Sequence, residues 1–461
     1  MDTSTTSDRY AHITLSILQE VFSGYHPRNF GVRLWDGTTW GPEPGEKPLF
    51  TMVLQHPGAL RKMFLHVNEI ALGEAYVYDD FDIEGDIEAA FAMASHLFGM
   101  RLSLAAKIRL GRELLKIPSA GRSHTGRGAA QLQGALHSKE RDMQAVTYHY
   151  NASNDFFALW LDRRMVYSCA YFNSTDEDLD VAQERKLDYI CRKLRLQQGD
   201  RLLDIGCGWG GLIIHAAKKY GVTAVGITLS EPQVQLANER IHQEGLTGRC
   251  LAKLCDYRDV DEPENYDKIV SVGMFEHVGE AMLPEYFKRG WKVLKPGGVF
   301  LNHGLASGLN EAKTRNDTFS NRYIFPDSQV LPISTTLRVA EASGFEVRDV
   351  ESLRENYELT LRHWLRRLEA HHDDARRLTD EPTYRIWRLN HAGAALGFKT
   401  NRHSIYQVLL LKPDRDESKL PLTRAGGHSQ FPLRCSLPSA RAFLLCRNGP
   451  VAGYEKEDGT R

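Results

Sequence analysis

The chain has little of what marks a membrane-spanning or nucleic-acid-binding protein. Residues 1–9 are polar and contain no apolar signal core, and no run of about 18 apolar residues could cross a bilayer. The 58 Lys and Arg residues are balanced by 59 Asp and Glu residues, so no global basic field attracts nucleic acid. We therefore expect no nucleic-acid partner, and a peripheral contact where the protein meets a membrane.

Cysteine is also sparse. The seven Cys residues are odd in number and show no paired spacing typical of metal ligands. This usage suits a reducing compartment. We therefore expect a cytoplasmic protein with no disulfide framework and no bound metal.

At 461 residues, the chain is long enough for two or three domains. Short apolar segments with turn signals, including residues 32–37 and 50–54, predict a small α+β module with short strands near the N-terminus. The predicted domains are, in order, an N-terminal module (1–115), a Gly- and Ser-rich flexible linker (116–140), a catalytic domain (141–413) and a poorly ordered tail (414–461).

A basic helical stretch closes the N-terminal module. Residues 100–115 combine Arg101, Lys107, Arg109 and Arg112 with leucines at helical spacing. Such a helix can lie on an anionic lipid surface, and it can equally be an ordinary solvated helix face. Both interpretations stay open at this point.

From residue 199 onward the pattern alternates between apolar strands and helices, which favours a parallel sheet. Helices are expected after Gly210 and over residues 230–243, and the Lys-Pro-Gly-Gly segment at 295–298 predicts a turn. The pattern predicts an α/β fold with a doubly wound sheet, which binds ligands beyond the carboxyl ends of its strands. The expected strands are residues 201–205, 224–229, 249–254, 268–273, 299–303, 345–350 and 405–411.

The most informative segment runs from Leu202 to Gly210, where an apolar strand leads into a glycine turn and then a helix. Gly206 and Gly208 let the backbone turn sharply and approach a ligand closely, and Asp204 can anchor the turn or a charged end of the ligand. The Gly-x-Gly-x-Gly spacing differs from the dinucleotide pattern, so it favours S-adenosylmethionine over a nicotinamide cofactor. A strand-turn-helix with a purely structural role is the alternative.

Two further segments are candidates for cofactor contacts. The second strand ends at Thr228 and Leu229 without the acid that many nucleotide sites use for ribose, but Gln233 on the next helix can serve both hydroxyls. Asp256 and Tyr257 follow the third strand and could hold adenine by a hydrogen bond and an aromatic face. An exposed glutamine, a turn acid and a packing aromatic are the structural alternatives.

A carboxylate is expected where the reactive methyl group of the cofactor should lie. Glu276 follows the strand that ends at Gly273, and His303 ends the next strand at the same sheet edge. That position favours a catalytic role for Glu276. A helix cap and a structural histidine are the alternatives.

Residues 149–157 (HYNASNDFF) and 167–172 (YSCAYF) make the interpretation specific. Together with the glycine turn, the Phe-Glu-His block at 275–277, His303 and Tyr357, they resemble the cyclopropane-fatty-acyl-phospholipid synthase family, which includes the mycolic acid cyclopropane synthases. The resemblance covers residues 148–413 and implies a class I methyltransferase, Rossmann-like fold. Residues 72–76 and 83–86 also resemble the lipid-binding module of longer bacterial members.

In that family a bicarbonate ion beside the transferred methyl group is held by four side chains and a backbone amide. The resemblance assigns these roles to Cys169, Glu276, His303 and Tyr357, with the main chain of Leu305 as a further ligand. It also assigns cofactor contacts to Tyr150, Tyr167, Thr228, Leu229 and Gln233. The chain departs from the usual family pattern at residues 151–153 and at His303-Gly304-Leu305, which puts substrate shape and efficiency in question rather than the anion ligands.

The resemblance implies transfer of a methylene group from S-adenosylmethionine to the cis double bond of an unsaturated phospholipid in a membrane bilayer. Residues 321–326 could line an acyl channel or merely pack as an inserted loop. Open alternatives are a methyl-branched product, small-amine N-methylation, and a lipid-binding protein whose methyltransferase domain is degenerate. A homodimer is one open alternative for the assembly.

Overall fold

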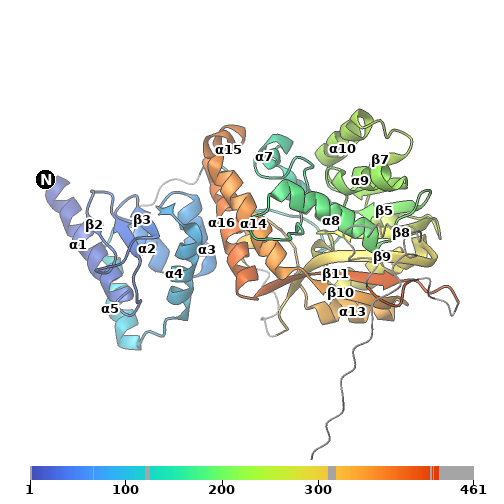
Figure 1. Cartoon of the computed structure of the whole chain (residues 1–461). Coiled ribbons are helices and arrows are strands. Elements are labelled where there is room, and N and C mark those ends of the chain that lie inside the picture. The colour runs from blue at the N-terminus through green and yellow to red at the C-terminus, as the bar shows by residue number, and fades with distance from the viewer. Residues whose placement is uncertain are drawn as a thin grey trace, which may run out of the picture. The chain divides into compact units, whose positions relative to one another are not determined.

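The computed structural model describes residues 3–65, 67–119, 125–309, 318–415, 418 and 420–424 (Figure 1). Residues 1–420 form one compact unit. Most of the predicted tail, residues 414–461, lies outside the described residues. Within the described part of the chain, none of the helices is long and apolar enough to cross a membrane.

The N-terminal part is an α+β module, as its short apolar segments predict. Its sheet has the order β2-β1-β3-β4, with β1 and β3 parallel and the other pairs antiparallel. Of the segment at residues 32–37, Val32 and Arg33 end β1, and the remaining residues form the turn to β2, in which Gly37 adopts a φ of +89°. Its elements are α1 (Thr3–Val21), β1 (Phe30–Arg33), β2 (Thr39–Trp40), β3 (Phe50–Leu54), α2 (Ala59–Phe64), α3 (Glu69–Val77), β4 (Phe81–Gly85), α4 (Ile87–Gly99) and α5 (Leu104–Leu115).

Three helices lead from the module to the larger sheet: α6 (Lys139–Tyr150), α7 (Asn154–Ala158) and α8 (Leu179–Lys193). The Arg127 side chain, in the predicted linker, donates from Nη2 to the carbonyl of Tyr148 at 3.1 Å, and its backbone N–H donates to Asp380 at 3.0 Å. Part of this segment is therefore held by hydrogen bonds to the catalytic part. The domain boundaries drawn from the sequence stay predictions.

The larger sheet has seven strands in the order β10-β11-β9-β8-β5-β6-β7, and β11 runs antiparallel to both its neighbours. This confirms the α/β doubly wound fold. The predicted turn at residues 295–298 lies inside β9, where the register breaks: Tyr266 faces Leu294, whereas Lys268 faces Val299. The strands are β5 (Arg201–Ile205), β6 (Thr223–Thr228), β7 (Cys250–Leu254), β8 (Tyr266–Val272), β9 (Leu294–Ser307), β10 (Glu346–Ser352) and β11 (His403–Leu411).

Helices cover both faces of this sheet because successive strand side chains point to opposite sides. Leu202 packs with α8 and α9 in one apolar cluster, whereas Leu203 packs with α11 and α13 in another. The remaining helices are α9 (Gly211–Tyr220), α10 (Glu231–Gln243), α11 (Leu283–Val293), α12 (Phe319–Tyr323), α13 (Ile333–Ala342), α14 (Arg354–Ala370), α15 (His372–Leu378) and α16 (Glu381–Lys399), with short 3-10 turns η1 (Tyr257–Asp259), η2 (Phe275–His277) and η3 (Glu280–Met282).

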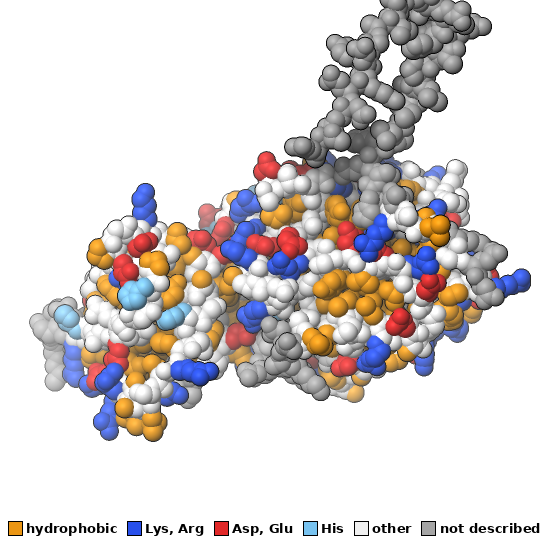
Figure 2. All heavy atoms as spheres, turned by 60° about the horizontal axis from the view of Figure 1, so that its bottom comes forward, with side chains coloured by type: hydrophobic (Ala, Val, Ile, Leu, Met, Phe, Trp, Pro, Cys, Tyr) orange, Lys and Arg blue, Asp and Glu red, His pale blue; other side chains and the backbone are white. Residues whose placement is uncertain are grey.

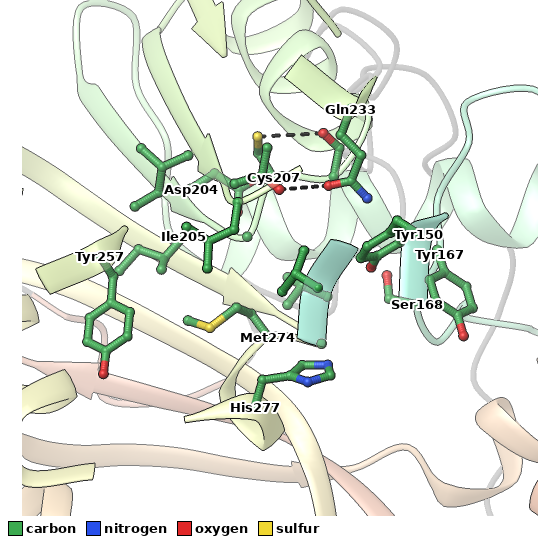
Figure 3. A pocket seen from close by; sticks show the side chains of 18 of the residues that line it. Tyr150, Tyr167, Ser168, Asp204, Ile205, Cys207, Gln233, Tyr257, Met274 and His277 are labelled. Atoms are coloured by element: carbon green, nitrogen blue, oxygen red, sulfur yellow. Dashed lines mark hydrogen bonds between the residues drawn. The ribbon is translucent and has the colours of Figure 1, made fainter. Parts of the chain in front are cut away.

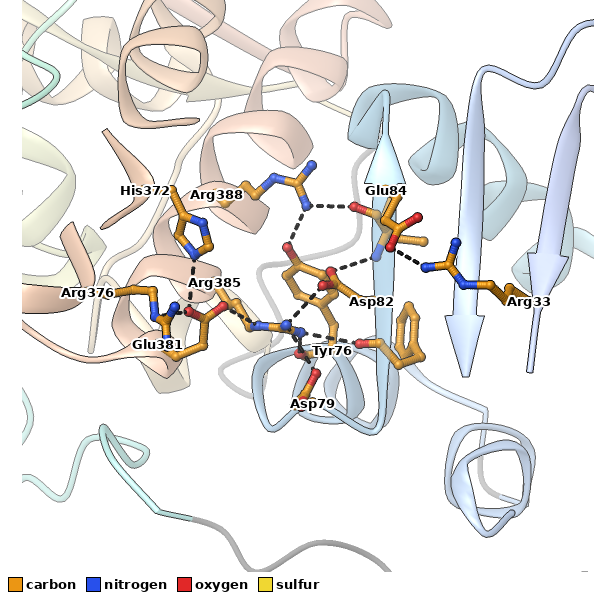
Figure 4. A network of polar contacts seen from close by, with 12 residues as sticks. Arg33, Tyr76, Asp79, Asp82, Glu84, His372, Arg376, Glu381, Arg385 and Arg388 are labelled. Carbon is orange, nitrogen blue, oxygen red and sulfur yellow. Dashed lines mark hydrogen bonds and ion pairs between the residues drawn. The ribbon is translucent and has the colours of Figure 1, made fainter. Parts of the chain in front are cut away.

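Helix α16 carries two buried arginines that hold the N-terminal module (Figure 4). Arg388 donates to the Tyr76 hydroxyl at 2.8 Å and to the Ile83 carbonyl at 3.1 Å, and it pairs with Glu369 at 2.7 Å. Arg385 donates to the Tyr76 carbonyl at 2.9 Å and pairs with Asp82 at 3.0 Å. A buried guanidinium satisfied by this many acceptors fixes the geometry of the contact.

Replacing Arg388 with Leu should therefore destabilise the protein by about 2 to 4 kcal/mol, because the Tyr76 hydroxyl and the Ile83 carbonyl lose their donor inside the protein. The matched control is Arg376→Leu, whose arginine is 52% exposed and pairs with Glu381 at 2.8 Å. That change should cost less than about 1 kcal/mol. Denaturant unfolding followed by circular dichroism measures both, and equal effects would refute the role of Arg388.

Candidate active site

A pocket lies at the carboxyl ends of β5, β6 and β8, where the doubly wound sheet is expected to bind its ligand (Figure 3). Tyr150, Tyr167 and Ser168 stand on one side of it, and Asp204, Ile205 and Tyr257 on the other. All ten residues expected at the cofactor line this pocket: Tyr150, Tyr167, Asp204, Gly206, Gly208, Thr228, Leu229, Gln233, Asp256 and Tyr257. The sequence pattern therefore brings together the residues it singled out for the cofactor.

The glycine turn has a packing reason that the sequence does not reveal. Gly206 has a φ of +89°, and a Cβ added there would lie 2.7 Å from the Cβ of Met274. Gly304 leaves room for Phe275, the residue after Met274, because a Cβ added at Gly304 would lie 2.5 Å from the ring of Phe275. Around Gly208 nothing lies within 4 Å of such a Cβ, so only its φ of +53° favours glycine.

Gln233 is well placed to serve a hydroxyl-bearing ligand. Its side chain is 2% exposed, and its Oε1 accepts from the hydroxyl of Thr228 at 2.7 Å. The buried Nε2 has no partner within full hydrogen-bond distance among the described residues, although Gln233 lies close enough to Tyr150 to lower the pKa of its hydroxyl. A ligand oxygen that accepts from this amide would complete its hydrogen bonding.

The two acids at the pocket differ in their surroundings. Asp204 is buried, its Oδ1 has no partner among the described residues, and burial raises its pKa to about 7. Asp256 is instead occupied, because Arg258 binds its two oxygens at 2.8 and 2.6 Å. The expected hydrogen bond between Asp256 and adenine stays a prediction. In such a contact adenine and Arg258 would both bind the carboxylate of Asp256.

The residues expected at the bicarbonate come from four separate segments, and three of them, Cys169, Glu276 and Tyr357, interact electrostatically and form what we call the deeper cluster. Cys169 precedes α8, Glu276 lies in η2, His303 in β9 and Tyr357 in α14. Cys169 and His303 are fully buried, and Glu276 is 6% exposed. Burial raises the pKa of the Tyr357 hydroxyl, and charge on Cys169 and Glu276 raises it further, so these groups share one low-dielectric region. Their role as anion ligands stays a prediction.

One hydrogen bond holds one oxygen of the Glu276 carboxyl group, and the other oxygen is available to a ligand. Its Oε1 accepts the backbone N–H of Leu305 at 3.3 Å, so the amide expected to bind the anion donates to this carboxyl group instead. Its Oε2 and the Nε2 of His303 are buried and have no partner among the described residues. Burial raises the pKa of Glu276 to about 7 and lowers that of His303 well below its usual value. Both groups are therefore available in neutral form.

The cofactor pocket and the deeper cluster adjoin through tyrosines. Tyr150 and Tyr167 meet edge to face, with ring centroids 6.4 Å apart. Burial raises the pKa of Tyr150 to about 12, and charge on Glu276 acts in the same direction. Charge on Glu276 also raises the pKa of Tyr167, after burial and the other tyrosines. Both rings therefore line the cofactor pocket and lie near the carboxyl group of Glu276.

Two residues of the pocket escaped the sequence reasoning. Ser168 lies between Tyr167 and Cys169, and Lys186 lies on α8 with its Nζ 2.7 Å from the Ser168 hydroxyl. Lys186 carries the sequence signal of an ordinary helix lysine, so its burial follows only from the fold. Of the predicted acyl-channel segment, Pro326 lines the pocket and Phe325 stacks on His149.

Comparison with known proteins agrees with this geometry. The model of the family described as mycolic acid cyclopropane synthetase matches residues 137–408, and that of a domain of unknown function matches residues 17–99. The chain belongs to the mycolic acid cyclopropane synthetase family. It is an S-adenosylmethionine-dependent methyltransferase, as the sequence predicts.

Relatives match it over different lengths. A probable fatty acid methyltransferase of Pseudomonas putida is 38% identical and covers 85% of this chain and 94% of its own length. The cyclopropane-fatty-acyl-phospholipid synthase of Escherichia coli is 42% identical over 51% of this chain and 59% of its own length. The structure of the mycolic acid cyclopropane synthase CmaA1 complexed with SAH and CTAB has a TM-score of 0.55 at 33% identity and covers 59% of this chain and 98% of its own.

The pKa of Glu276 predicts how stability depends on pH. Between its ordinary value of 4.5 and about 7, the unfolded state loses this proton first, so the buried carboxyl group lowers the stability increasingly as the pH rises. Glu276→Gln cannot titrate. The melting temperature of Glu276→Gln minus that of the unchanged protein should therefore increase from pH 5 to pH 8. The same difference for Glu280→Gln, a change at an exposed residue, should not increase. Thermal melts at both pH values measure this, and parallel curves for Glu276→Gln would refute the raised pKa.

Proposed function

We propose that the chain transfers a one-carbon unit from S-adenosylmethionine to the cis double bond of an unsaturated acyl chain in a membrane phospholipid, and closes it into a cyclopropane ring. The observation that carries this proposal is the buried cluster of Cys169, Glu276 and Tyr357, in which every pKa is raised and which lies near Tyr150 and Tyr167 of the cofactor pocket. Methyl transfer to a nitrogen or oxygen nucleophile has no need of such a cluster around a carboxyl group.

An unactivated alkene is a weak nucleophile with no proton to lose, so the first step needs alignment and a dry pocket rather than a base. When bound, S-adenosylmethionine supplies the electrophilic methyl group. The alkene then carries a positive charge, and the ring faces of Tyr150 and Tyr167 favour that charge. Loss of one proton from the new methyl group lets its carbon bond to the second alkene carbon, which closes the ring.

The deeper cluster suits an anion such as bicarbonate, which would supply the base. An ionised Glu276 would repel it, but the raised pKa makes a carboxyl O–H donor accessible near neutral pH. The Cys169 thiol and the Tyr357 hydroxyl keep their protons, because burial raises both pKa values. The Gln407 amide nitrogen lies 3.4 Å from His303 Nδ1, so donation there would leave the ring proton on the unpartnered Nε2. Four donors could then face one anion.

A methyl-branched product is the second candidate, and the name of the Pseudomonas putida relative favours it. To separate the two, the purified protein is incubated with vesicles of a cis-unsaturated phospholipid and S-adenosylmethionine carrying a trideuterated methyl group. Ring closure removes one deuteron, and proton NMR of the unlabelled product then shows upfield ring protons. For a methyl branch, the cation instead loses a proton from the acyl chain, so the product keeps all three deuterons and shows alkene protons, which would support the second candidate. Lipid without label would refute both.

Within this mechanism Glu276→Gln should lower turnover roughly a hundredfold or more, because the neutral amide cannot exchange the proton that the carboxyl group shares. Cys169→Ser should be milder, since a hydroxyl still donates to an anion and no covalent bond to sulfur is required. Affinity for S-adenosylmethionine, measured by calorimetry, should change little in both. Unchanged turnover of folded Glu276→Gln at saturating bicarbonate would remove Glu276 from the mechanism.

The N-terminal module supports contact with a bilayer. An apolar groove runs between α1, α4 and α5, and Leu104, Ile108 and Leu115 of α5 are 74%, 49% and 58% exposed. Lys107 and Arg112 are exposed on the same helix. Figure 2 shows hydrophobic and basic side chains side by side on this module. Exposed apolar groups ringed by cations suit an anionic lipid surface, which favours the first of the two interpretations of this helix.

We expect the double variant Lys107→Gln/Arg112→Gln to bind phosphatidylglycerol vesicles roughly tenfold or more weakly, because each cation near the surface contributes about 1 kcal/mol. Leu104→Ser/Ile108→Ser should weaken binding at both low and high salt. The matched control is Leu251→Ser/Leu254→Ser on β7, whose leucines are 45% and 47% exposed far from α5 in sequence. Vesicle co-sedimentation measures all three. Equal binding by every variant would place the lipid contact elsewhere.

A further inference from the structure

His149 is a buried histidine near the end of α6 that takes no part in the proposed mechanism. It lines the cofactor pocket and is 2% exposed. Its Nδ1 lies 2.7 Å from the carbonyl oxygen of Ile324, in the predicted acyl-channel segment. A carbonyl oxygen can only accept, so Nδ1 carries a proton and donates it to Ile324.

The ring of His149 is neutral and holds a single proton. Burial lowers the pKa of His149 to about 3 against the opposing effect of the hydrogen bond to Ile324, and charge on His277 and Arg127 lowers it further. The other ring nitrogen, Nε2, is buried and has no partner among the described residues. Since Nδ1 holds the only ring proton, Nε2 is an unprotonated acceptor. The hydrogen bond to Ile324 therefore fixes the tautomer.

Aromatic side chains from separate parts of the site pack against this ring. Phe325, in the predicted acyl-channel segment, stacks on His149 with ring centroids 4.6 Å apart and planes at 23°. Tyr167, expected at the cofactor, also stacks on it, at 5.7 Å and 18°. Tyr150 and Trp387 meet it edge to face, at 4.6 and 5.3 Å. His149 thus contacts both the cofactor side and the predicted acyl side.

Two other side chains of α6 hold the same segment. The Tyr148 hydroxyl lies 3.3 Å from the carbonyl oxygen of Tyr323, and Arg141 binds the carboxylate of Asp327 at 2.6 and 3.0 Å. The described residues that line the pocket include His149 but neither Tyr148 nor Arg141. His149 is therefore the side chain of this group that connects the held segment to the pocket wall.

We infer that His149 is a positioning residue, which holds the predicted acyl-channel segment against Tyr167 through one hydrogen bond and two stacking contacts. This role rests on the proposed function, because it assumes that residues 321–326 meet the acyl chain. A misplacement of about 1 Å can lower a rate roughly a hundredfold, so a residue that fixes the spacing controls turnover without touching the reacting atoms. A neutral ring also avoids repulsion with the sulfonium of the cofactor and with the charged alkene.

Three substitutions separate the hydrogen bond from the ring. His149→Phe keeps a ring that can stack but leaves the Ile324 carbonyl without its donor. The amide nitrogen in His149→Asn lies as many bonds from Cα as Nδ1, so it can donate to that carbonyl, whereas the amide nitrogen in His149→Gln lies as far out as Nε2. Turnover of a cis-unsaturated phospholipid, followed with methyl-labelled S-adenosylmethionine, should fall roughly tenfold or more in His149→Phe and His149→Gln. His149→Asn should restore part of it.

Affinity for S-adenosylmethionine, measured by calorimetry without lipid, should change little in His149→Phe, because its ring can still stack on Tyr167. The matched control is His215→Phe, at a buried histidine of α9 outside the described pocket lining, and it should change neither quantity. Equal turnover of His149→Phe and His149→Asn would overturn the inference. So would a loss of cofactor affinity in His149→Phe as large as its loss of turnover.

Nitrogen-15 NMR of the histidine-labelled protein keeps the test decisive if the His149 variants do not fold. The His149 signal is identified by its shift in Phe325→Leu, which removes a stacked ring. It should show a proton on Nδ1 and no titration from pH 5 to pH 8. A proton on Nε2, or titration in that range, would refute the inference. This measurement needs no lipid, so an unchanged protein that labels no lipid would refute the proposed function alone.

Discussion

The active site depends on how closely the turn η2 can approach two neighbouring strand ends. Met274 occupies the space that a Cβ at Gly206 would fill, and Phe275 occupies the equivalent space at Gly304. With both residues seated, Glu276 is carried to the sheet edge and its carboxyl group meets the backbone N–H of Leu305. Packing of two apolar side chains against two glycines thus positions a polar group, and a methyl group at either glycine would displace the turn from the cofactor pocket.

This constraint explains what could be predicted from the sequence and what could not. The strands β5, β6 and β8 and the pocket at their carboxyl ends follow from local patterns, because apolar runs and glycine turns are short-range signals. Gly304 appeared in the sequence as a departure from the family pattern, and only its contact with Phe275 gives it a physical reason. Lys186 was missed because nothing local distinguishes a buried helix lysine from an exposed one.

The same distinction separates Asp204 from Asp256. Both follow from their positions at strand ends, and both line the pocket. What differs is the neighbour: Arg258 binds both oxygens of Asp256, whereas Asp204 keeps an oxygen without a partner among the described residues. Partners set the chemistry of a carboxyl group. The coupling of Cys169 and Glu276 to Tyr357 has no local sequence signal, because these residues lie far apart in the chain.

Helix α16 connects the two halves of the proposed function. Arg385 and Arg388 on it hold β4 and α3 of the N-terminal module, while Trp387 packs on His149 with ring centroids 5.3 Å apart. His149 in turn stacks on Tyr167 at the cofactor pocket, at 5.7 Å. Close-packed interiors transmit displacement. The proposed lipid-binding surface and the proposed reacting centre therefore belong to one compact unit and are linked by a continuous series of packed side chains.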